Sequence, residues 1–386
     1  MTSTAPVIVA ARRTPIGTAG RGFARHSVDA LAAPVLAAVA GSVASSGLPV
    51  DDVVLGNCMG PGGDLARVAA LRAGLGTSVP GVTVDRQCGS GLDAVMQAAA
   101  RVSSGDARLV LAGGAESAST APHRVWPDTG ARYARAPFAP VGFADPDMGP
   151  AAEHLARVRD ISRARQDAWA LRSHAAALRA RSAGAFDAEL VAVDAVDSDD
   201  RPRAMSAEVL ARFAPAFAID DLAGEGAATP RGTVTAGNSC GFSDGAAAMA
   251  VTLPEVAREL GLPGLRVRAS AVAAGDPALP GIGAAPAAAR ALERAGLTAR
   301  DLGAVEITEA FAAQVIAVVD ELGLDEAIVN ADGGAIALGH PWGASGAVLL
   351  VRLAARLAAS DDDRPALAAC SIGGGQGIAM IVERVA

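Results

Sequence analysis

The chain has 386 residues, of which 51% are apolar, and its formal net charge is −8. This composition predicts a globular protein of two or three packed units and argues against disorder, because no long polar or like-charged tract interrupts the apolar pattern. The 33 basic residues are all arginines scattered among 41 acidic ones, which excludes lysine Schiff-base chemistry and disfavours nucleic-acid binding.

The first predicted elements are a strand over Pro6–Ala11, a helix over Asp29–Ser45 and a strand over Val53–Asn57. Short β-rich runs continue to alternate with alanine-rich helical segments, which predicts α/β layers. The uncharged stretch Ala30–Val50 is nearly long enough to cross a bilayer. It is mostly Ala, Gly and Ser and contains two prolines, so we interpret it as a buried helix and expect no membrane insertion.

An early and a late part of the chain run through similar elements in the same order. In the first part, DDVVLGN precedes VTVDRQCGSGLDAVMQAAARV and ARLVLAGGAES. In the second part, LGAVEITEAFA precedes NADGGAIALGHPWGASGAVLLVRLAARL and PALAACSIGGGQGIAMIVERV. Each part is typical of a strand, a glycine-rich turn into a helix, and final strands. We therefore predict two similar α/β units whose glycine-rich turns, at Cys88 and His340, meet near their shared boundary.

The middle of the chain has a different composition, in which arginines, acids and prolines replace the smooth apolar alternation. We predict an inserted lid that carries substrate contacts, since loops on a rigid scaffold vary without disturbing the core. The alternative is an ordinary surface excursion. The predicted division is an N-terminal half over 1–117 and 246–265, an insertion over 118–245, and a C-terminal half over 266–386.

The four cysteines, Cys58, Cys88, Cys240 and Cys370, are too few and too widely spaced for a disulfide framework. They also form no CxxC pair typical of zinc, so we expect reduced thiols and no metal site. The N-terminus lacks the order of charge, apolar core and cleavage site of a signal peptide. These features predict a cytoplasmic protein.

Cys88 is a candidate nucleophile because it precedes a helix that opens through Gly89, Ser90 and Gly91. The partial positive charge of unpaired N–H groups at a helix N-terminus is expected to lower the pKa of its thiol. The alternative is a packed core cysteine. GGAIALGHPWGASG favours catalysis, because it places His340 in a turn suited to close backbone approach, and a Cys–His pair is an acyl-transfer arrangement.

Two further segments carry candidate groups. CSIGGGQG joins two strands through glycines whose N–H groups would face a developing oxyanion, although glycine-rich hairpins are common. EITEAFA places Thr308, Glu309 and Phe311 where a strand becomes a helix. The alternative for this segment is a helix cap by Thr308, with Glu309 in the first helical turn.

Together and in this order, these segments resemble the thiolases. Further matches, such as VVLGN, GDARLVLAGGAESAS, MGPAAEHLA and GTVTAGNSCGFSDGAAA, extend the resemblance over essentially the whole chain. It implies an α/β thiolase fold, with two βαβαβαββ halves in a five-layered α-β-α-β-α core and an inserted loop domain that holds coenzyme A. It also implies an acyl-CoA C-acyltransferase that cleaves 3-ketoacyl-CoA with free CoA or condenses acyl-CoAs, without a permanently bound cofactor.

The resemblance assigns roles to particular residues. Cys88 would carry the acyl group, and His340 would support thiolate formation and stabilise the thioester oxygen. Backbone N–H groups of Cys88 and Gly373 would form the second oxyanion hole. The implied contacts with the substrate or CoA are Met148, Cys240, Asn238, Ala236, Phe311 and Arg203. Cys240 replaces a serine expected near the pantetheine arm.

Two positions depart from the family. Ser371 stands where thiolases have a second cysteine that moves the substrate proton, and a hydroxyl is a far weaker acid and base than a thiol. Cys370 lies one place earlier and should point away, since neighbouring residues of a strand face opposite sides. Thr308 replaces an Asn or His that positions a catalytic water, and its shorter side chain need not hold that water in the same place.

These departures leave alternatives to a working thiolase. One is a thiolase-like acyltransferase or thioester hydrolase of a specialised pathway that has lost efficient Claisen chemistry. Another is a catalytically silent partner subunit, and a carrier-protein ketosynthase is disfavoured because such enzymes pair their cysteine with two histidines. The loop between His123 and Met148 is shorter than in tetrameric thiolases, so we expect a homodimer. Acyl chain length and reaction direction stay open.

Overall fold

The computed structural model describes residues 5–217 and 232–385. Its main element is a ten-stranded sheet in the order β10-β11-β12-β9-β1-β8-β5-β3-β4, with β2 paired to β8. Its strands are β1 (Val7–Arg13), β2 (Gly17–Thr18), β3 (Asp52–Gly56), β4 (Gly81–Val84), β5 (Leu109–Ser117), β8 (Ser243–Thr252), β9 (Gly264–Ala274), β10 (Ala304–Ile307), β11 (Ala366–Ile372) and β12 (Gln376–Val385). A separate hairpin pairs β6 (Arg124–Val125) with β7 (Arg132–Tyr133).

The sheet consists of two halves with the same strand arrangement, joined where β1 runs antiparallel to β9. In the first half, β3 runs parallel to β5, which is followed by antiparallel β8 and β1. In the second half, β10 runs parallel to β11, which is followed by antiparallel β12 and β9. The prediction of two similar α/β units is therefore confirmed.

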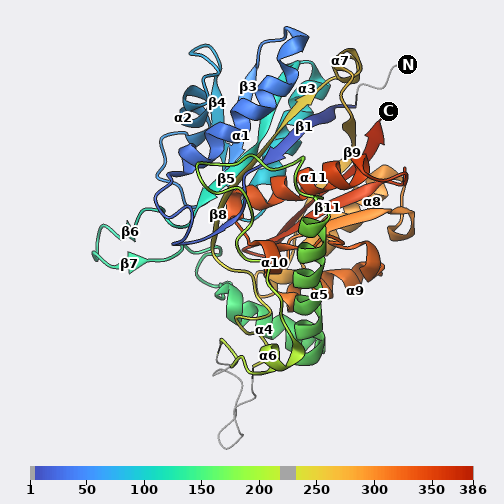
Figure 1. Ribbon diagram of the computed structural model, residues 1–386. Coiled ribbons are helices and arrows are strands. Elements are labelled where there is room, and N and C mark those ends of the chain that lie inside the picture. The colour runs from blue at the N-terminus through green and yellow to red at the C-terminus, as the bar shows by residue number, and fades with distance from the viewer. Residues whose placement is uncertain (1–4, 218–231, 386) are drawn as a thin grey trace, which may run out of the picture.

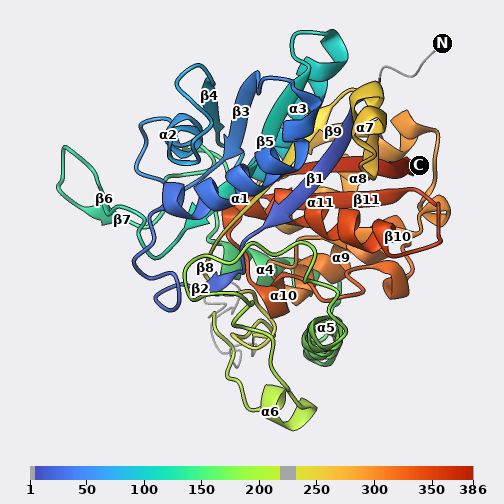
Figure 2. The ribbon, with the colours of Figure 1, turned by 45° about the horizontal axis from the view of Figure 1, so that its top comes forward.

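Helices complete five layers around the two halves of the sheet. The first half is covered on its outer side by α1 (Val28–Val43) and α2 (Leu65–Arg72), and the second half by α8 (Ala284–Ala295) and α9 (Ala312–Leu322). Between the halves, α3 (Ser90–Ser104) packs against α11 (Trp342–Ala358), and their apolar side chains form one core with the inner sheet faces (Figures 1 and 2). We call α3 and α11 the central layer.

One helix, Val28–Ser46, is long and apolar enough to cross a membrane by length and composition alone. In the structure, Leu31, Val35, Leu36 and Val39 of this helix are buried against the sheet. The interpretation as a core helix is therefore confirmed, and the apolar run is explained by its packing.

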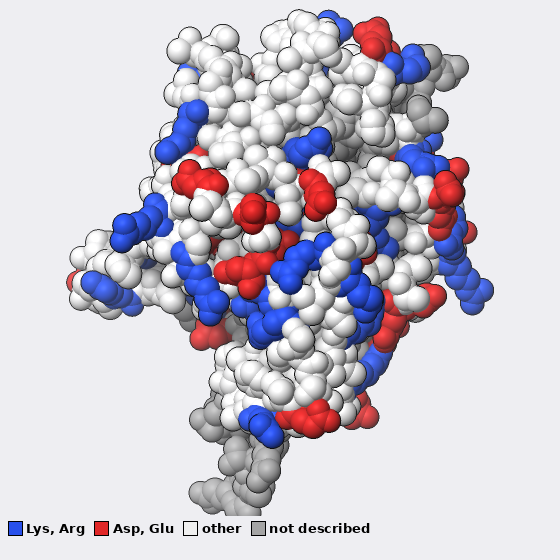
Figure 3. All heavy atoms as spheres, viewed as in Figure 1, with Lys and Arg blue, Asp and Glu red and all other residues white. Residues whose placement is uncertain are grey.

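Between β5 and β8 the chain leaves the main sheet. This part contains α4 (Met148–Val158), α5 (Arg163–Ser182) and α6 (Ala207–Ala211), which lie together below the sheet in Figure 1. The remaining helices of the described residues are α7 (Pro254–Leu260), α10 (Ala335–Leu338) and the short 3-10 turns Ala44–Ser46, Pro280–Ile282, Ala299–Asp301 and Glu326–Ile328. Acidic and basic side chains are interspersed over the face shown in Figure 3.

Candidate active site

The N-terminal turns of α3 and α11 touch, which brings the segments of Cys88 and His340 to the same end of the central layer. A β-carbon at Gly91 would lie 2.8 Å from the carbonyl oxygen of Gly343, and one at Gly346 would lie 2.5 Å from the backbone nitrogen of Leu92. Only glycine permits backbones to approach so closely. The prediction that the two glycine-rich turns meet is confirmed.

Local hydrogen bonds fix the turn that carries Cys88. The hydroxyl of Ser90 accepts from the N–H of Arg86 at 2.8 Å and donates to the carbonyl of Gln87 at 2.6 Å. A carboxylate oxygen of Asp85 accepts from the N–H of Gln87 at 2.8 Å. These bonds hold Gln87 at a positive φ of 47°, so Cys88 is presented at a tight turn directly before α3.

The environment of Cys88 raises the pKa of its thiol. Burial is the main cause, the thiols of Cys370 and Cys240 add to it, and the backbone N–H of Cys88 opposes it. The prediction of a lowered pKa is therefore wrong, because desolvation outweighs the helix N-terminus. Cys58 also lies in electrostatic range of Cys88. Cysteines that are far apart in the sequence thus lie near Cys88, and all four are free thiols.

His340 is buried, with 2% of its surface exposed. Its Nδ1 lies 2.6 Å from the hydroxyl of Ser345, which donates to the carbonyl of Pro341 at 3.1 Å. Because that hydroxyl has one proton, the network assigns the other hydrogen to Nδ1 and leaves Nε2 as an acceptor. Within residues 5–217 and 232–385, Nε2 is buried without a hydrogen-bond partner. Burial lowers the pKa of His340 to about 4, which keeps the ring neutral.

Ser371 and Cys370 face opposite sides of β11, as predicted. The hydroxyl of Ser371 donates to the carbonyl of Gly281 at 2.6 Å and accepts from the N–H of Ala284 at 3.1 Å. Ser371 is partly exposed, whereas Cys370 is completely buried. The thiol of Cys370 contacts Thr308 and lies in electrostatic range of Cys88, so the prediction that Cys370 points away from the site is wrong.

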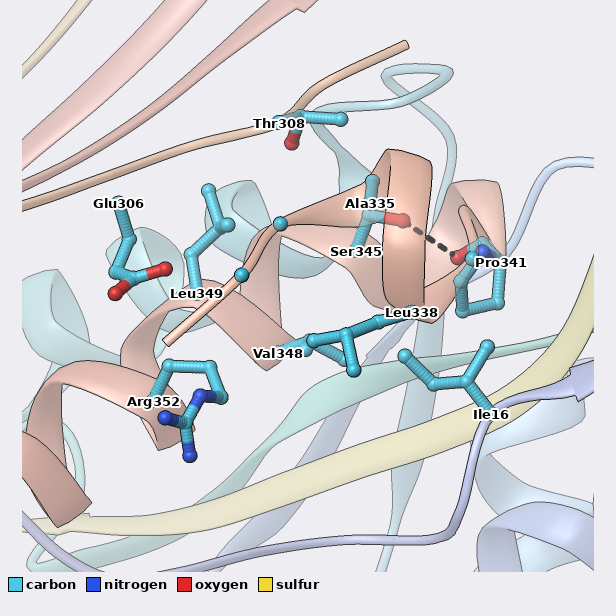
Figure 4. Close-up of a pocket in the computed structure, with 13 residues that line it drawn as sticks. Ile16, Glu306, Thr308, Ala335, Leu338, Pro341, Ser345, Val348, Leu349 and Arg352 are labelled. Carbon is cyan, nitrogen blue, oxygen red and sulfur yellow. Dashed lines mark hydrogen bonds between the residues drawn. The ribbon is translucent and has the colours of Figure 1, made fainter. Parts of the chain in front are cut away.

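Thr308 is buried, and its hydroxyl lies 3.2 Å from the thiol of Cys370. The helix-cap alternative is wrong, because α9 begins only at Ala312 and follows Phe311. Thr308 also lines a cavity of about 20 Å³ together with Pro341 and Ser345 (Figure 4). The cavity is lined mainly by apolar side chains, and its volume is about that of one water molecule.

The glycine-rich turn after β11 is covered by the segment that precedes α4. A β-carbon at Gly373 would lie 2.6 Å from the ring of Phe138. The guanidinium of Arg135 lies 4.7 Å from the centre of that ring and pairs with Asp145 at 3.0 Å and Asp147 at 2.9 Å. Asp147 immediately precedes Met148, so these ion pairs tie the start of α4 to the turn of Gly373.

Comparisons with known proteins agree with this geometry. The thiolase N-terminal domain matches residues 6–254, and the thiolase C-terminal domain matches residues 263–384. The chain belongs to the thiolase family. It is 40% identical over 392 residues to an acetyl-CoA acetyltransferase of Cupriavidus necator, and 41% identical over 399 residues to a 3-ketoacyl-CoA thiolase of Escherichia coli O1:K1. Each match covers 98% of this chain and 99% of the relative.

A solved structure is similar to this chain over nearly its whole length. The crystal structure of the Bacillus anthracis acetyl-CoA acetyltransferase matches with a TM-score of 0.89 and 36% identity, covering 99% of this chain and 100% of that one. The predicted thiolase fold is therefore confirmed. The α-β-α-β-α layers described above are the layers of that fold.

Several predicted substrate contacts of this thiolase lie where a ligand can reach them. Cys240 and Phe311 are partly exposed, and the N–H of Cys240 donates to the carbonyl of Ala310 at 3.0 Å. Ala236 and Arg203 are exposed. Their exposure is compatible with binding of CoA or substrate, and this role stays a prediction.

Asn238 is an exception among the predicted contacts. Its side chain is completely buried, its amide donates to Asp167 at 2.9 Å and to the carbonyl of Thr233 at 3.1 Å, and its oxygen accepts from the N–H of Thr235 at 2.8 Å. The hydrogen-bonding groups of this side chain are used inside the protein, so a contact of Asn238 with the substrate would involve its backbone and stays a prediction. Asn238 instead shapes the segment that leads to Cys240.

Two buried glutamates position the site, of which Glu116 was missed in the sequence and Glu309 was named without being assigned this role. Glu116 accepts hydrogen bonds from Asn57, from backbone N–H groups of the turn after β3 and from the N–H of Gly343 at the start of α11. Glu309 accepts from Trp169 and Ser173, each at less than 3 Å, and from the N–H of Ile336. These residues could have been identified in the sequence as a lone carboxylate within an apolar run such as LVLAGGAES, since a buried charge requires hydrogen-bonding partners.

Proposed function

We propose that this thiolase is an acyl-CoA C-acyltransferase that forms an acyl-Cys88 intermediate. It would cleave 3-ketoacyl-CoA with free CoA or condense acyl-CoAs in the reverse direction. Membership of the family supports the reaction class, as do relatives named acetyl-CoA acetyltransferase and 3-ketoacyl-CoA thiolase. The structural observation that carries the proposal is the contact between the N-terminal turns of α3 and α11, which bear a thiol and a neutral imidazole.

The protonation states of the pair define how the nucleophile is formed. The raised pKa of Cys88 and the lowered pKa of His340 favour a neutral thiol beside a neutral imidazole rather than an ion pair. We propose that Nε2 of His340 accepts the thiol proton as sulfur attacks the substrate carbonyl. Among the described residues no hydrogen bond joins these two groups, so substrate binding must bring them into reach.

In thiolysis, the Cys88 thiolate adds to the 3-keto carbonyl, and the bond between carbons 2 and 3 then breaks. The departing enolate takes a proton at carbon 2 and leaves as acetyl-CoA, and free CoA then takes the acyl group from Cys88 to give an acyl-CoA that is two carbons shorter. Ser371 occupies the position from which thiolases supply this proton. Its hydroxyl proton is directed to the carbonyl of Gly281, which supports the expectation that proton transfer from Ser371 is slow.

The negative charge that develops on oxygen needs hydrogen-bond donors. We propose the backbone N–H groups of Cys88 and Gly373 for this role, supported by the packing of Ile372, which precedes Gly373, against Gly89. A water molecule in the cavity beside Thr308 is our proposal for the water that thiolases hold with an asparagine. The volume of about 20 Å³ and the hydroxyl of Thr308 support it.

We further propose a cytoplasmic homodimer that uses CoA thioesters as substrates and binds no permanent cofactor. The free thiols suit a reducing compartment. The edge strand β4 supports dimerisation, because it ends the sheet and Val82 on it is 40% exposed. A silent subunit or a hydrolase is not favoured by the names of the relatives.

The acyl-enzyme is tested by incubating the protein with acetoacetyl-CoA, quenching in acid and measuring peptide masses. We expect one acetyl group on the peptide that contains Cys88. Cys240→Ala, which removes a neighbouring thiol, should keep this label, and Cys88→Ala should lose it. Acetylation of another cysteine, or of none, would contradict the proposal.

A further inference from the structure

The ring of Phe138 lies on the glycine whose N–H is proposed to hold the thioester oxygen. A β-carbon at Gly373 would lie 2.6 Å from Cε2 and 2.7 Å from Cδ2 of this ring. A β-carbon at Gly374 would lie 3.0 Å from the carbonyl oxygen of Phe138. Both glycines belong to the turn that joins β11 to β12. The insertion therefore places an aromatic side chain directly against the glycine-rich turn.

The strands that this turn joins pack beside the nucleophile. A β-carbon at Gly89 would overlap Cδ1 of Ile372 and lie 2.9 Å from Cγ2 of Ile378. Gly89 follows Cys88, and Ile372 precedes the first glycine of the turn. The turn that Phe138 covers is therefore held against the turn of Cys88 by direct contacts.

The surroundings of Cys88 restrict the direction of an acyl chain bound to its sulfur. Ile372 and Ile378 fill the space on the side of β11 and β12. The contact between the first turns of α3 and α11 fills the side of the central layer. An acyl chain whose thioester oxygen is held by the N–H of Gly373 then lies along the glycine-rich turn, which leads to the ring of Phe138.

Arg135 fixes the position of this ring. Its guanidinium carbon lies 4.7 Å from the centre of the Phe138 ring. Its nitrogens donate to the carboxylate of Asp147 at 2.9 Å, to the carboxylate of Asp145 at 3.0 and 3.1 Å, and to the carbonyl of Asp145 at 2.9 Å. Asp145 also accepts from the backbone N–H of Phe138 at 3.2 Å. Charge-assisted bonds of a planar guanidinium define a single geometry, so the ring forms a rigid wall.

We propose that Phe138 closes the far end of the acyl pocket, and that this thiolase acts on short-chain 3-oxoacyl thioesters and excludes longer ones. The inference rests on the proposed acyl-Cys88 chemistry and specifies its substrate class. A rigid wall excludes a longer chain by steric overlap, since extra methylenes enter a packed site only by displacing side chains.

The test measures kcat/KM for thiolysis of acetoacetyl-CoA, 3-oxohexanoyl-CoA and 3-oxooctanoyl-CoA with free CoA. We expect the unmodified protein to lose roughly tenfold or more from the four-carbon to the eight-carbon substrate, because a pocket discriminates one methylene by about 10- to 200-fold. Phe138→Ala should raise kcat/KM for 3-oxooctanoyl-CoA relative to acetoacetyl-CoA by roughly tenfold or more. Phe138→Leu should give a smaller change in the same direction. Phe143→Ala, which removes an exposed ring of the same insertion, is the matched control and should keep the original preference.

Two results would overturn the inference. One is equal kcat/KM of the unmodified protein for the four-carbon and the eight-carbon substrate. The other is a change by the same factor on all three substrates in Phe138→Ala, which would assign the ring to the shape of the loop or to the pantetheine arm. Melting temperatures establish that each variant is folded, and Phe138→Leu carries the test if Phe138→Ala is not. Failure of the proposed function is distinguishable, because the unmodified protein would then cleave none of the three thioesters.

Discussion

The carboxylate of Glu116 accepts a hydrogen bond from the backbone N–H of Gly343 at 3.0 Å. Its oxygens also accept from the N–H groups of Cys58 and Met59, each at 3.1 Å. One buried side chain at the end of β5 therefore joins the turn after β3 to the start of α11. Because Gly343 follows His340 closely in the sequence, this carboxylate fixes the histidine relative to the half of the molecule that carries Cys88.

Glu116→Gln should destabilise the protein and lower its activity. The amide nitrogen of glutamine would face N–H donors that the carboxylate now satisfies. We expect a loss of about 2 to 4 kcal/mol in the free energy of unfolding, measured by urea denaturation. Glu293→Gln, exposed on α8, should leave stability unchanged. Equal midpoints for the two variants would contradict this role of Glu116.

Ser345→Ala should reduce kcat with little change in KM. The alanine removes the hydroxyl that accepts from Nδ1 of His340, so the ring is free to turn or to exchange its proton between nitrogens. We expect a decrease of roughly tenfold or more, measured with saturating substrate over a range of pH. Ser42→Ala, which removes a hydroxyl bonded to Ala38 on α1, is the matched control. An unchanged kcat at every pH would show that Ser345 does not position the base.

Ser371→Cys should accelerate thiolysis, whereas Cys370→Ala should leave turnover intact, since the Cys370 thiol only adds to the raised pKa of Cys88. Ser371 is partly exposed and Cys370 is completely buried. A thiol at 371 titrates far closer to neutral pH than a hydroxyl. We expect a gain of roughly ten- to a hundredfold in kcat for Ser371→Cys. The account of Ser371 would fail if this variant were slower and Cys370→Ala alone abolished turnover.

Stability should decrease as the pH falls below about 6.5, the ordinary pKa of histidine. Burial lowers the pKa of both His340 and His174 to about 4, so between these values the unfolded chain binds more protons than the folded one. Stability is therefore complete above pH 6.5 and is lost toward pH 4. His174→Leu should lose less than the unmodified protein between pH 7.5 and pH 5 in urea denaturation. Identical losses of stability in the two proteins would show that protonation of His174 does not cause the pH dependence.

Much of the fold could be predicted from the sequence, because the sequence patterns that indicate its strands, helices and turns are local and occur in both halves. The alternation of strands and helices, and the two glycine-rich turns, predicted the paired halves and the meeting of α3 with α11. The helix over Asp29–Ser45 agrees closely with α1 over Val28–Val43. Its apolar face required a sheet to bury it, which the composition already indicated.

The electrostatics of the site were less accessible because they depend on contacts between distant segments. The helix N-terminus alone predicted a lowered pKa for Cys88, but the pKa is raised by burial and by the thiols of Cys240 and Cys370, which come from distant segments. The contact of Thr308 with Cys370 arises only when β10 and β11 pair. The hydrogen bonds of Asn238 likewise join α5 to the segment before β8. The pattern of apolar residues along the chain does not predict them.

The central claim is that Cys88 performs thiolase chemistry, and the most direct measurement is thiolysis of acetoacetyl-CoA by the purified protein with free CoA. Cys88→Ala provides the control. We predict measurable cleavage by the unmodified protein and none by the variant, which would also show that Ser371 and Thr308 suffice for carbon–carbon bond cleavage. Equal rates for the two proteins, or the absence of cleavage in both, would contradict the account.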